Sequence, residues 1–178
     1  ATTFEQALRE DRIQLQFQPQ FRLEDGTLRA FEALSRWDHE DLGTVEPEEF
    51  VRRAERSTAI AGFTCRTLRL TRRFQERAER AGTPCTVSVN LSVQMLRKEE
   101  HREALLATLD SLAFPPGRLT LELQDSQLLD ADEDAEALCR SLVERGVELA
   151  LDDFGDGYTA LDLLRRLPNQ TEVADLLV

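Results

Sequence analysis

Strand-type and helix-type segments alternate along the second half of this chain, and that alternation narrows the folds it can adopt. Expected strands lie at 86–90, 119–123 and 147–151, and expected helices at 98–112, 131–145 and 159–167. Repeated strand-then-helix units imply parallel strands with helices outside them. The fold class is therefore α/β, either a doubly wound sheet or a barrel.

The first half begins differently. Residues 15–21 alternate apolar side chains with Gln, which is the period of a half-buried strand. Asp25-Gly26 follows, a pair that favours a tight hairpin turn, so residues 28–35 are expected to return antiparallel to the first strand. Helical spacing then begins at Pro47, and a longer helix is expected over 60–81.

Hard oxygen ligands stand at the ends of the expected strands. Glu32 follows 28–31, Asn90 closes 86–90, Glu122 lies in 119–123, and Asp152 with Asp153 follows 148–151. Carboxylates are costly to bury without partners, so this placement suggests a shared cation, for which Mg²⁺ or Mn²⁺ suits the oxygen donors. A barrel brings strand ends together on one face, and the chain has no glycine-rich phosphate loop of the open-sheet type.

Each of these residues also has a plainer interpretation. The aspartate pair could be an acidic turn that caps the next helix, the glutamates could face water, and Asn90 could be a turn residue. Arg36 could bind a phosphate with two hydrogen bonds or form a surface ion pair with the acidic run 38–41. Gln18 could contact a base edge.

Composition excludes several classes of function. The net charge of −12 argues against binding long nucleic acid, and no apolar run is long enough to cross a bilayer, so we expect a cytoplasmic protein without membrane insertion. The three cysteines fit packed, reduced thiols. His39 and His101 stand in charged stretches, where we expect exposed side chains that are neither bases nor ligands.

Taken in order, the motifs resemble those of EAL-domain cyclic di-GMP phosphodiesterases. They are Phe17-Gln18-Pro19-Gln20, Phe31-Glu32-Ala33-Leu34-Ser35-Arg36-Trp37, Val89-Asn90-Leu91-Ser92, Leu121-Glu122-Leu123 and Asp152-Asp153-Phe154-Gly155-Asp156-Gly157-Tyr158. The resemblance covers about residues 4–168 and implies a modified TIM (β/α)8 barrel with an antiparallel first strand.

The resemblance also implies a two-metal site. Glu32, Asn90, Glu122 and Asp152 would hold one Mg²⁺ or Mn²⁺, and Asp152 with Asp153 would help to hold a second. Gln18 and Arg36 match positions that contact guanine and phosphate. The implied reaction is hydrolysis of cyclic di-GMP to linear pGpG in bacterial signalling.

Three departures from the family pattern stand out. Asp125 replaces the glutamate that steadies the loop after the paired aspartates, and Asp156 stands where a small residue is usual. After Leu167-Pro168 the family's Lys-Ile-Asp and Ala-Glu-Gly-Val-Glu strands do not follow, so a lysine and a late glutamate are missing from residues 169–178. We divide the chain into an EAL-type barrel domain, 1–168, and an unassigned tail or joined remnant, 169–178.

Two explanations fit that ending. The natural protein could be longer, or the domain could be shortened and degenerate; we expect the former, because a barrel without its last strands would expose two sheet edges. The leading hypothesis is a cyclic di-GMP phosphodiesterase. The alternatives are an inactive cyclic di-GMP receptor and an interaction scaffold, and the family admits a homodimer and sensory or GGDEF neighbours.

Overall fold

A computed structural model of the chain describes residues 3–41, 43–45, 47–55, 59–124 and 133–152. The strands are β1 (Ile13–Phe21), β2 (Leu28–His39), β3 (Gly43–Val45), β4 (Val87–Asn90), β5 (Leu119–Gln124) and β6 (Glu148–Asp152). The helices are α1 (Phe4–Arg9), α2 (Pro47–Glu55), α3 (Ala59–Arg80), α4 (Gln94–Arg97), α5 (Glu99–Leu112) and α6 (Glu133–Glu144). The expected helix at 159–167 lies outside the described residues.

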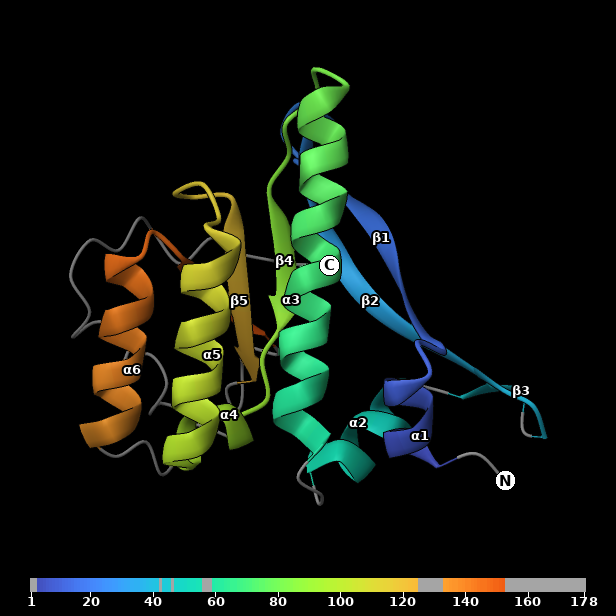
Figure 1. Cartoon of the computed structure of the whole chain (residues 1–178). Coiled ribbons are helices and arrows are strands. Elements are labelled where there is room, and N and C mark those ends of the chain that lie inside the picture. Colours follow the sequence, from blue (N-terminus) through green and yellow to red (C-terminus); the bar gives the residue numbers. More distant parts are fainter. Residues whose placement is uncertain (1–2, 42, 46, 56–58, 125–132, 153–178) are drawn as a thin grey trace.

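The described strands form one mixed sheet in the order β1-β2-β4-β5-β6, with β3 paired to β2 (Figure 1). β1 runs antiparallel to β2, whereas β2, β4, β5 and β6 are parallel to one another. This arrangement confirms the predicted α/β class and the antiparallel first strand. The carboxyl ends of the four parallel strands therefore meet at one edge of the sheet.

The hairpin between β1 and β2 is confirmed, but its turn is longer than a tight two-residue loop. Residues 22–27 make the connection, which is closed by a hydrogen bond of 2.8 Å from the Arg22 amide to the Thr27 carbonyl. Inside it, the Asp25 carboxylate accepts hydrogen bonds from the Thr27 amide and hydroxyl. The Asp25-Gly26 pair thus marks the turn correctly, while a side-chain bond sets its form.

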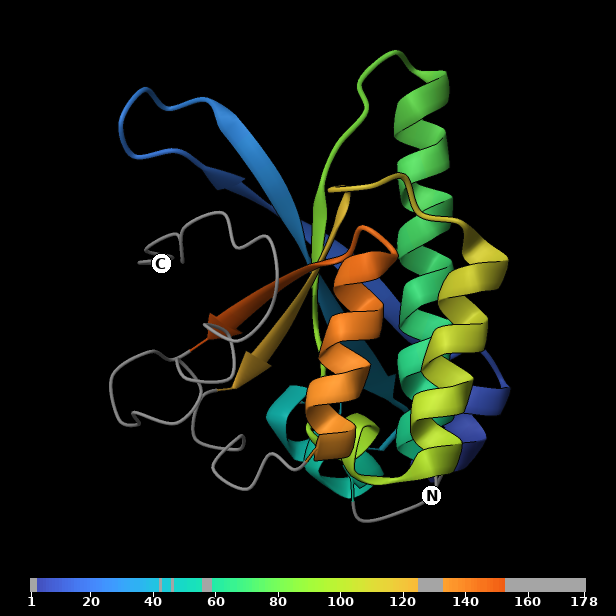
Figure 2. The same ribbon diagram turned by 90° about the vertical axis from the view of Figure 1, so that its left-hand side faces the viewer.

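The long helices α3, α5 and α6 cover one face of the sheet (Figures 1 and 2). Phe74 of α3 stacks on Phe17 of β1 and meets Phe31 of β2 edge-on. Successive residues of a strand point to opposite faces, so Phe31 places its neighbour Glu32 on the face away from these helices. That second face carries the candidate site.

Glu32 does not end its strand, contrary to the sequence expectation. β2 continues to His39 because β1 pairs with it as far as Trp37 and β3 pairs with its last residues. The parallel pairing with β4, however, covers only Phe31 to Ala33. Glu32 is therefore near the end of the parallel ladder although it lies inside a longer strand.

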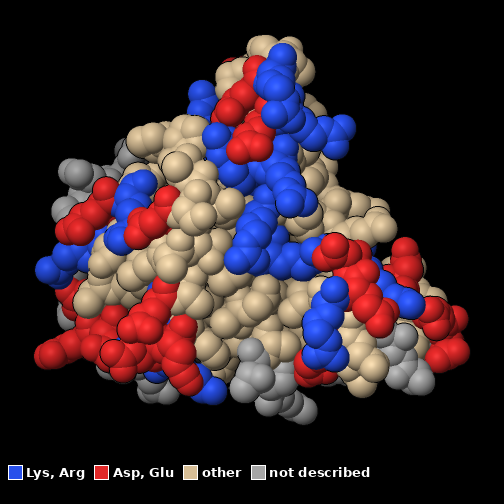
Figure 3. All heavy atoms as spheres, viewed as in Figure 1, with Lys and Arg blue, Asp and Glu red and all other residues tan. Residues whose placement is uncertain are grey.

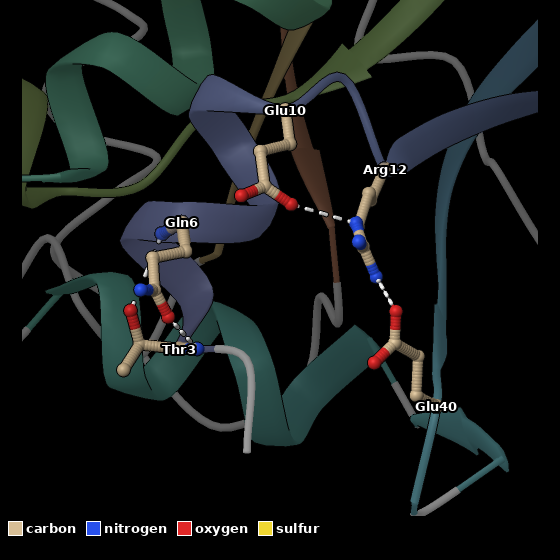
Figure 4. A network of polar contacts seen from close by, with 5 residues as sticks. All are labelled: Thr3, Gln6, Glu10, Arg12 and Glu40. Carbon is tan, nitrogen blue, oxygen red and sulfur yellow. Dashed lines mark hydrogen bonds and ion pairs between the residues drawn. The ribbon is translucent and has the colours of Figure 1, made fainter.

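The N-terminal helix α1 was not predicted, and polar contacts hold both of its ends (Figure 4). Thr3 and Gln6 form a reciprocal capping box at its start. Beyond its end, Arg12 pairs with Glu10 at 2.8 Å and also with Glu40 after β2. The Arg12–Glu40 ion pair joins the segment before β1 to the segment after β2, at the open end of the β1–β2 hairpin.

Charge is distributed unevenly over the helix layer (Figure 3). Basic side chains form a strip over α3, which contains Arg66, Arg69, Arg72, Arg73, Arg77 and Arg80, and acidic side chains gather over the first turns of α5 and α6. The basic strip lies on the opposite side of the sheet from Glu32. In the part of the chain that the structure describes, no helix has the length and apolar character needed to span a membrane.

Candidate functional site

Asn90 and Glu32 meet on the face of the sheet that points away from α3, α5 and α6. Asn90 is the last residue of β4, and its side-chain nitrogen donates a hydrogen bond of 3.1 Å to the Glu32 carboxylate on β2. Glu32 is half-buried and Asn90 is exposed. The bond orients the Asn90 amide, since its nitrogen is engaged by Glu32 and its oxygen remains an acceptor or ligand.

Glu122 lies next in the sheet. Its Cα pairs directly with that of Asn90, which places the two side chains on the same face of neighbouring strands. Glu122 is only 6% exposed, and a buried carboxylate requires a hydrogen-bond partner or a cation. Glu32, Asn90 and Glu122 therefore form a row across three adjacent strands, as the sequence predicted.

Ser88 lies below this row. Its Cα pairs with those of Glu32 and Thr120, the residue is 3% exposed, and its hydroxyl has no hydrogen-bond partner among the described residues. Buried hydroxyls without partners are uncommon and often indicate a water or ion that completes them. The two carboxylates, the amide oxygen and this hydroxyl are all oxygen donors of the kind that Mg²⁺ and Mn²⁺ prefer.

The aspartates of the predicted site are only partly described. Asp152 ends β6, and its Cα pairs with that of Gln124 at the end of β5. Asp153, which would follow it toward the second ion, lies outside the described residues, as does Asp125. Among the residues that the structure describes, no three His, Cys, Asp or Glu side chains gather as a metal cluster, and Glu32 and Glu122 supply two carboxylates.

Arg36 lies on the same face as Glu32, four residues further along β2. Its Nε donates to the Gln16 side chain at 3.0 Å, and its Nη1 donates to the Ser35 carbonyl at 2.9 Å. No ion pair of Arg36 occurs among the described residues, so its alternative interpretation as a surface ion pair is not supported. Gln16 was not predicted, because a lone Gln in an alternating strand gives no functional signal.

Gln18 is exposed, and its Cα pairs with that of Glu32 across the hairpin. Alternation along β1 therefore places Gln16 and Gln18 on the site face, beside Arg36 and Glu32 respectively. The two residues predicted to contact substrate thus lie on one face with Glu32, Asn90 and Glu122.

The expected exposure of the two histidines is wrong. His39 and His101 are each 6% exposed. The His39 ring lies against Trp37, and its Nδ1 accepts a hydrogen bond from the Asp41 amide, whereas the His101 ring bonds the Gln94 carbonyl. Packing against neighbouring elements buries both residues, which local charge in the sequence does not reveal.

The cysteines are free and packed, as predicted. Cys65 and Cys139 are buried and Cys85 is half-buried. Burial raises the pKa of the Cys139 thiol to about 11 and also raises the pKa of Cys85. A thiol with so high a pKa is a poor nucleophile near neutral pH.

Comparison with known proteins agrees with this geometry. The EAL domain profile matches residues 1–171, so the chain belongs to the EAL domain family. It is 34% identical over 164 residues to the cyclic di-GMP phosphodiesterase NbdA of Pseudomonas aeruginosa, covering 92% of this chain and 21% of NbdA. It is 30% identical over 167 residues to the cyclic di-GMP phosphodiesterase PdeR of Escherichia coli, covering 94% of this chain and 25% of PdeR.

Solved structures show the same fold. The PaMucR phosphodiesterase in complex with c-di-GMP superposes with a TM-score of 0.79 at 27% identity, over 92% of this chain and 67% of that one. The FimX EAL domain of Pseudomonas aeruginosa bound to c-di-GMP gives a TM-score of 0.76 at 21% identity, over 92% and 65%. These neighbours confirm the EAL-type fold. The curated relatives are longer proteins, of which the chain spans about a fifth to about a half.

Proposed function

We propose that this chain is the substrate-binding and metal-binding part of a phosphodiesterase that hydrolyses cyclic di-GMP to linear pGpG. The observation that carries the proposal is the row Glu32–Asn90–Glu122 across the neighbouring parallel strands β2, β4 and β5. The similarity to the PaMucR complex and to two named cyclic di-GMP phosphodiesterases supports the same substrate.

Each residue has a task in this proposal. Glu32, the Asn90 amide oxygen, Glu122 and Asp152 would hold one Mg²⁺ or Mn²⁺, and Asp153 would join Asp152 at a second. When bound, such a pair of ions activates water and stabilises the leaving oxygen of a phosphodiester. The Glu32 carboxylate also accepts the hydrogen bond from the Asn90 side-chain nitrogen, which leaves the Asn90 amide oxygen without a role in that bond.

Substrate orientation would fall to β1 and β2. Arg36, held by Gln16, offers a guanidinium that matches the geometry of a phosphate. Gln18 is exposed beside Glu32 and offers an amide to a guanine edge. An arginine at this position also offsets part of the acidic field that two carboxylates would otherwise present to an anionic dinucleotide.

The family supplies the wider context of the proposal. From the family we propose a cytoplasmic location, sensory or GGDEF domains beside this one in the natural protein, and a homodimer. None of these is needed for the residue roles above.

The test uses the intact natural protein with cyclic di-GMP and either Mg²⁺ or Mn²⁺. Chromatography and mass spectrometry should detect pGpG, and EDTA should abolish its formation. Binding by calorimetry without any product would reject the enzyme in favour of a cyclic di-GMP receptor. Absence of both nucleotide and metal binding would select the interaction scaffold.

A further inference from the structure

Ser92, two residues beyond Asn90, is bonded to a side chain of a different element. Its hydroxyl donates to the Glu55 carboxylate at 2.6 Å and accepts from the Gln94 amide at 3.2 Å. The first bond is short, as expected where the acceptor is a carboxylate. The second bond lies at the first residue of α4, so one hydroxyl links α2 to the turn that follows β4.

The turn after β4 is also tied to the sheet. The Leu91 amide donates to the Glu122 carbonyl at 2.8 Å, and Asn90 itself donates to Glu32. Bonds thus reach the segment 90–92 from β2, β5, α2 and α4, the last through the Gln94 and Met95 amides, which donate to the Ser92 side chain and carbonyl. Among the described residues, Glu55 is the partner of this segment that is distant in the chain and lies outside the sheet.

Glu55 stands on a rigid support. It is the last residue of α2, whose Phe50 and Ala54 are fully buried in the core. Phe50 stacks on Phe4 and meets Trp37 edge-on, so α2 is anchored to both α1 and β2. A carboxylate on such a support can fix the position of a short loop without a contact to the site itself.

We infer that Glu55 is a positioning residue: through Ser92 it holds the end of β4 so that the Asn90 amide stays aimed at Glu32. The inference rests on the proposed function for its effect on metal binding and turnover. The Glu55 carboxylate is a fixed hydrogen-bond acceptor, and the Ser92 hydroxyl binds it. This bond restrains the turn after β4 and therefore Asn90, which is the residue that touches the site. Removal of either partner breaks the link to α2, while the bonds of residues 90–92 to the sheet and the bond from the Met95 amide to the Ser92 carbonyl remain.

The structural arm of the test needs no ligand. In the intact protein, Glu55→Ala and Ser92→Ala should each speed hydrogen exchange at the Leu91 amide and at the Asn90 side-chain amide, by about tenfold as for a lost local constraint. Glu55→Gln keeps an acceptor oxygen and should change exchange much less. Glu103→Ala removes an exposed helix glutamate of α5 elsewhere and should change nothing.

The functional arm measures Mn²⁺ affinity together with kcat and KM. Loss of a group that orients a ligand typically costs about 10–100-fold in metal affinity, so Glu55→Ala and Ser92→Ala should both fall in that range. The double variant should be no worse than either single variant, because both remove the same link. Glu55→Gln should restore most of the affinity.

The outcomes separate the two proposals. Unchanged exchange at Leu91 and Asn90 in Ser92→Ala, or additive losses in the double variant, would overturn the positioning role. The proposed function would be rejected if the unaltered protein neither binds Mn²⁺ nor forms pGpG. Faster exchange in Glu55→Ala and Ser92→Ala would in that case still support the link between Glu55 and Ser92. If Glu55→Ala does not fold, the comparison of Ser92→Ala with Glu55→Gln still decides between these results.

Discussion

Asn90 and Glu32 are joined by a 3.1 Å hydrogen bond although 58 positions separate them in the chain. The bond crosses from β4 to β2, and parallel pairing of these strands brings the two residues together. Neither side chain is free to turn without losing this contact. The oxygen-rich row of the site is therefore partly organised by the protein's own hydrogen bonds.

Substitution of Glu32 tests the assigned metal role. Glu32→Gln keeps the size of the side chain and an acceptor for Asn90 but removes the charge, so kcat/KM should fall by at least about 100-fold and Mn²⁺ affinity should weaken. Calorimetry and product analysis measure these two effects. The matched control is Glu148→Gln, which alters a carboxylate at the other end of β6, where it bonds Thr120. Unaltered hydrolysis in Glu32→Gln would refute the metal role.

The sequence predicted the site through one regularity, the placement of hard oxygen ligands where apolar strands end. Parallel strands bring their carboxyl ends to one edge, so Asn90 and Glu122 could be expected to pair, and they do. Glu32 was expected at a strand end but lies within β2, because pairing with β1 and β3 prolongs that strand. The expected strand end at Glu32 was therefore wrong, and its role as a site residue stays a prediction.

Residues that act through others could not be predicted. No local pattern in the sequence indicates the partners of Gln16 and Glu55, which lie far away in the chain: Arg36 in one case and Ser92 in the other. Which side chains meet is decided by strand register and helix packing, and neither is visible in a local pattern. The same reason explains why the burial of His39 and His101 was missed.

Arg36 is expected to contribute to substrate binding. Arg36→Lys keeps the charge but loses the planar pair of donors, so KM should rise by about tenfold, equivalent to ~1.4 kcal/mol, with a smaller change in kcat. Gln16→Ala removes the bond that orients the guanidinium and should raise KM by a smaller factor. Steady-state kinetics measures both changes. Arg69→Lys on the exposed face of α3 is the control, and equal KM values in all four proteins would contradict this assignment.

Two glycines allow a clean stability test. Gly82 and Gly146 both have φ of +77°, but a Cβ would meet nothing within 4 Å at Gly82 and would lie 2.9 Å from Pro116 at Gly146. Gly82→Ala should therefore cost only the left-handed backbone strain, ~1–2 kcal/mol. Gly146→Ala should cost a further ~1–3 kcal/mol from crowding. Urea unfolding measures the difference, and equal losses would show that the Pro116 contact relaxes at no cost.

Asp110 and Arg145 provide a pH-dependent link between α5 and the end of α6. The Arg145 guanidinium binds the Asp110 carboxylate through two hydrogen bonds of 2.7 and 3.2 Å, and these bonds lower the pKa of Asp110 below its ordinary value of 3.8. The folded protein therefore binds fewer protons at this site than the unfolded chain. The contribution to stability is present above pH ~4 and is lost as the pH falls through the lowered pKa.

Arg145→Met should return the pKa of Asp110 toward 3.8, as followed by NMR titration of its carboxyl carbon. The same variant should flatten the acid side of the pH–stability curve, with a small total effect because the pair is exposed to solvent and to salt. Arg140→Met removes a neighbouring ion pair, with Glu136, and should leave the Asp110 titration unchanged. An Asp110 pKa that stays low in Arg145→Met would show that another group, and not this guanidinium, holds the carboxylate in its charged form.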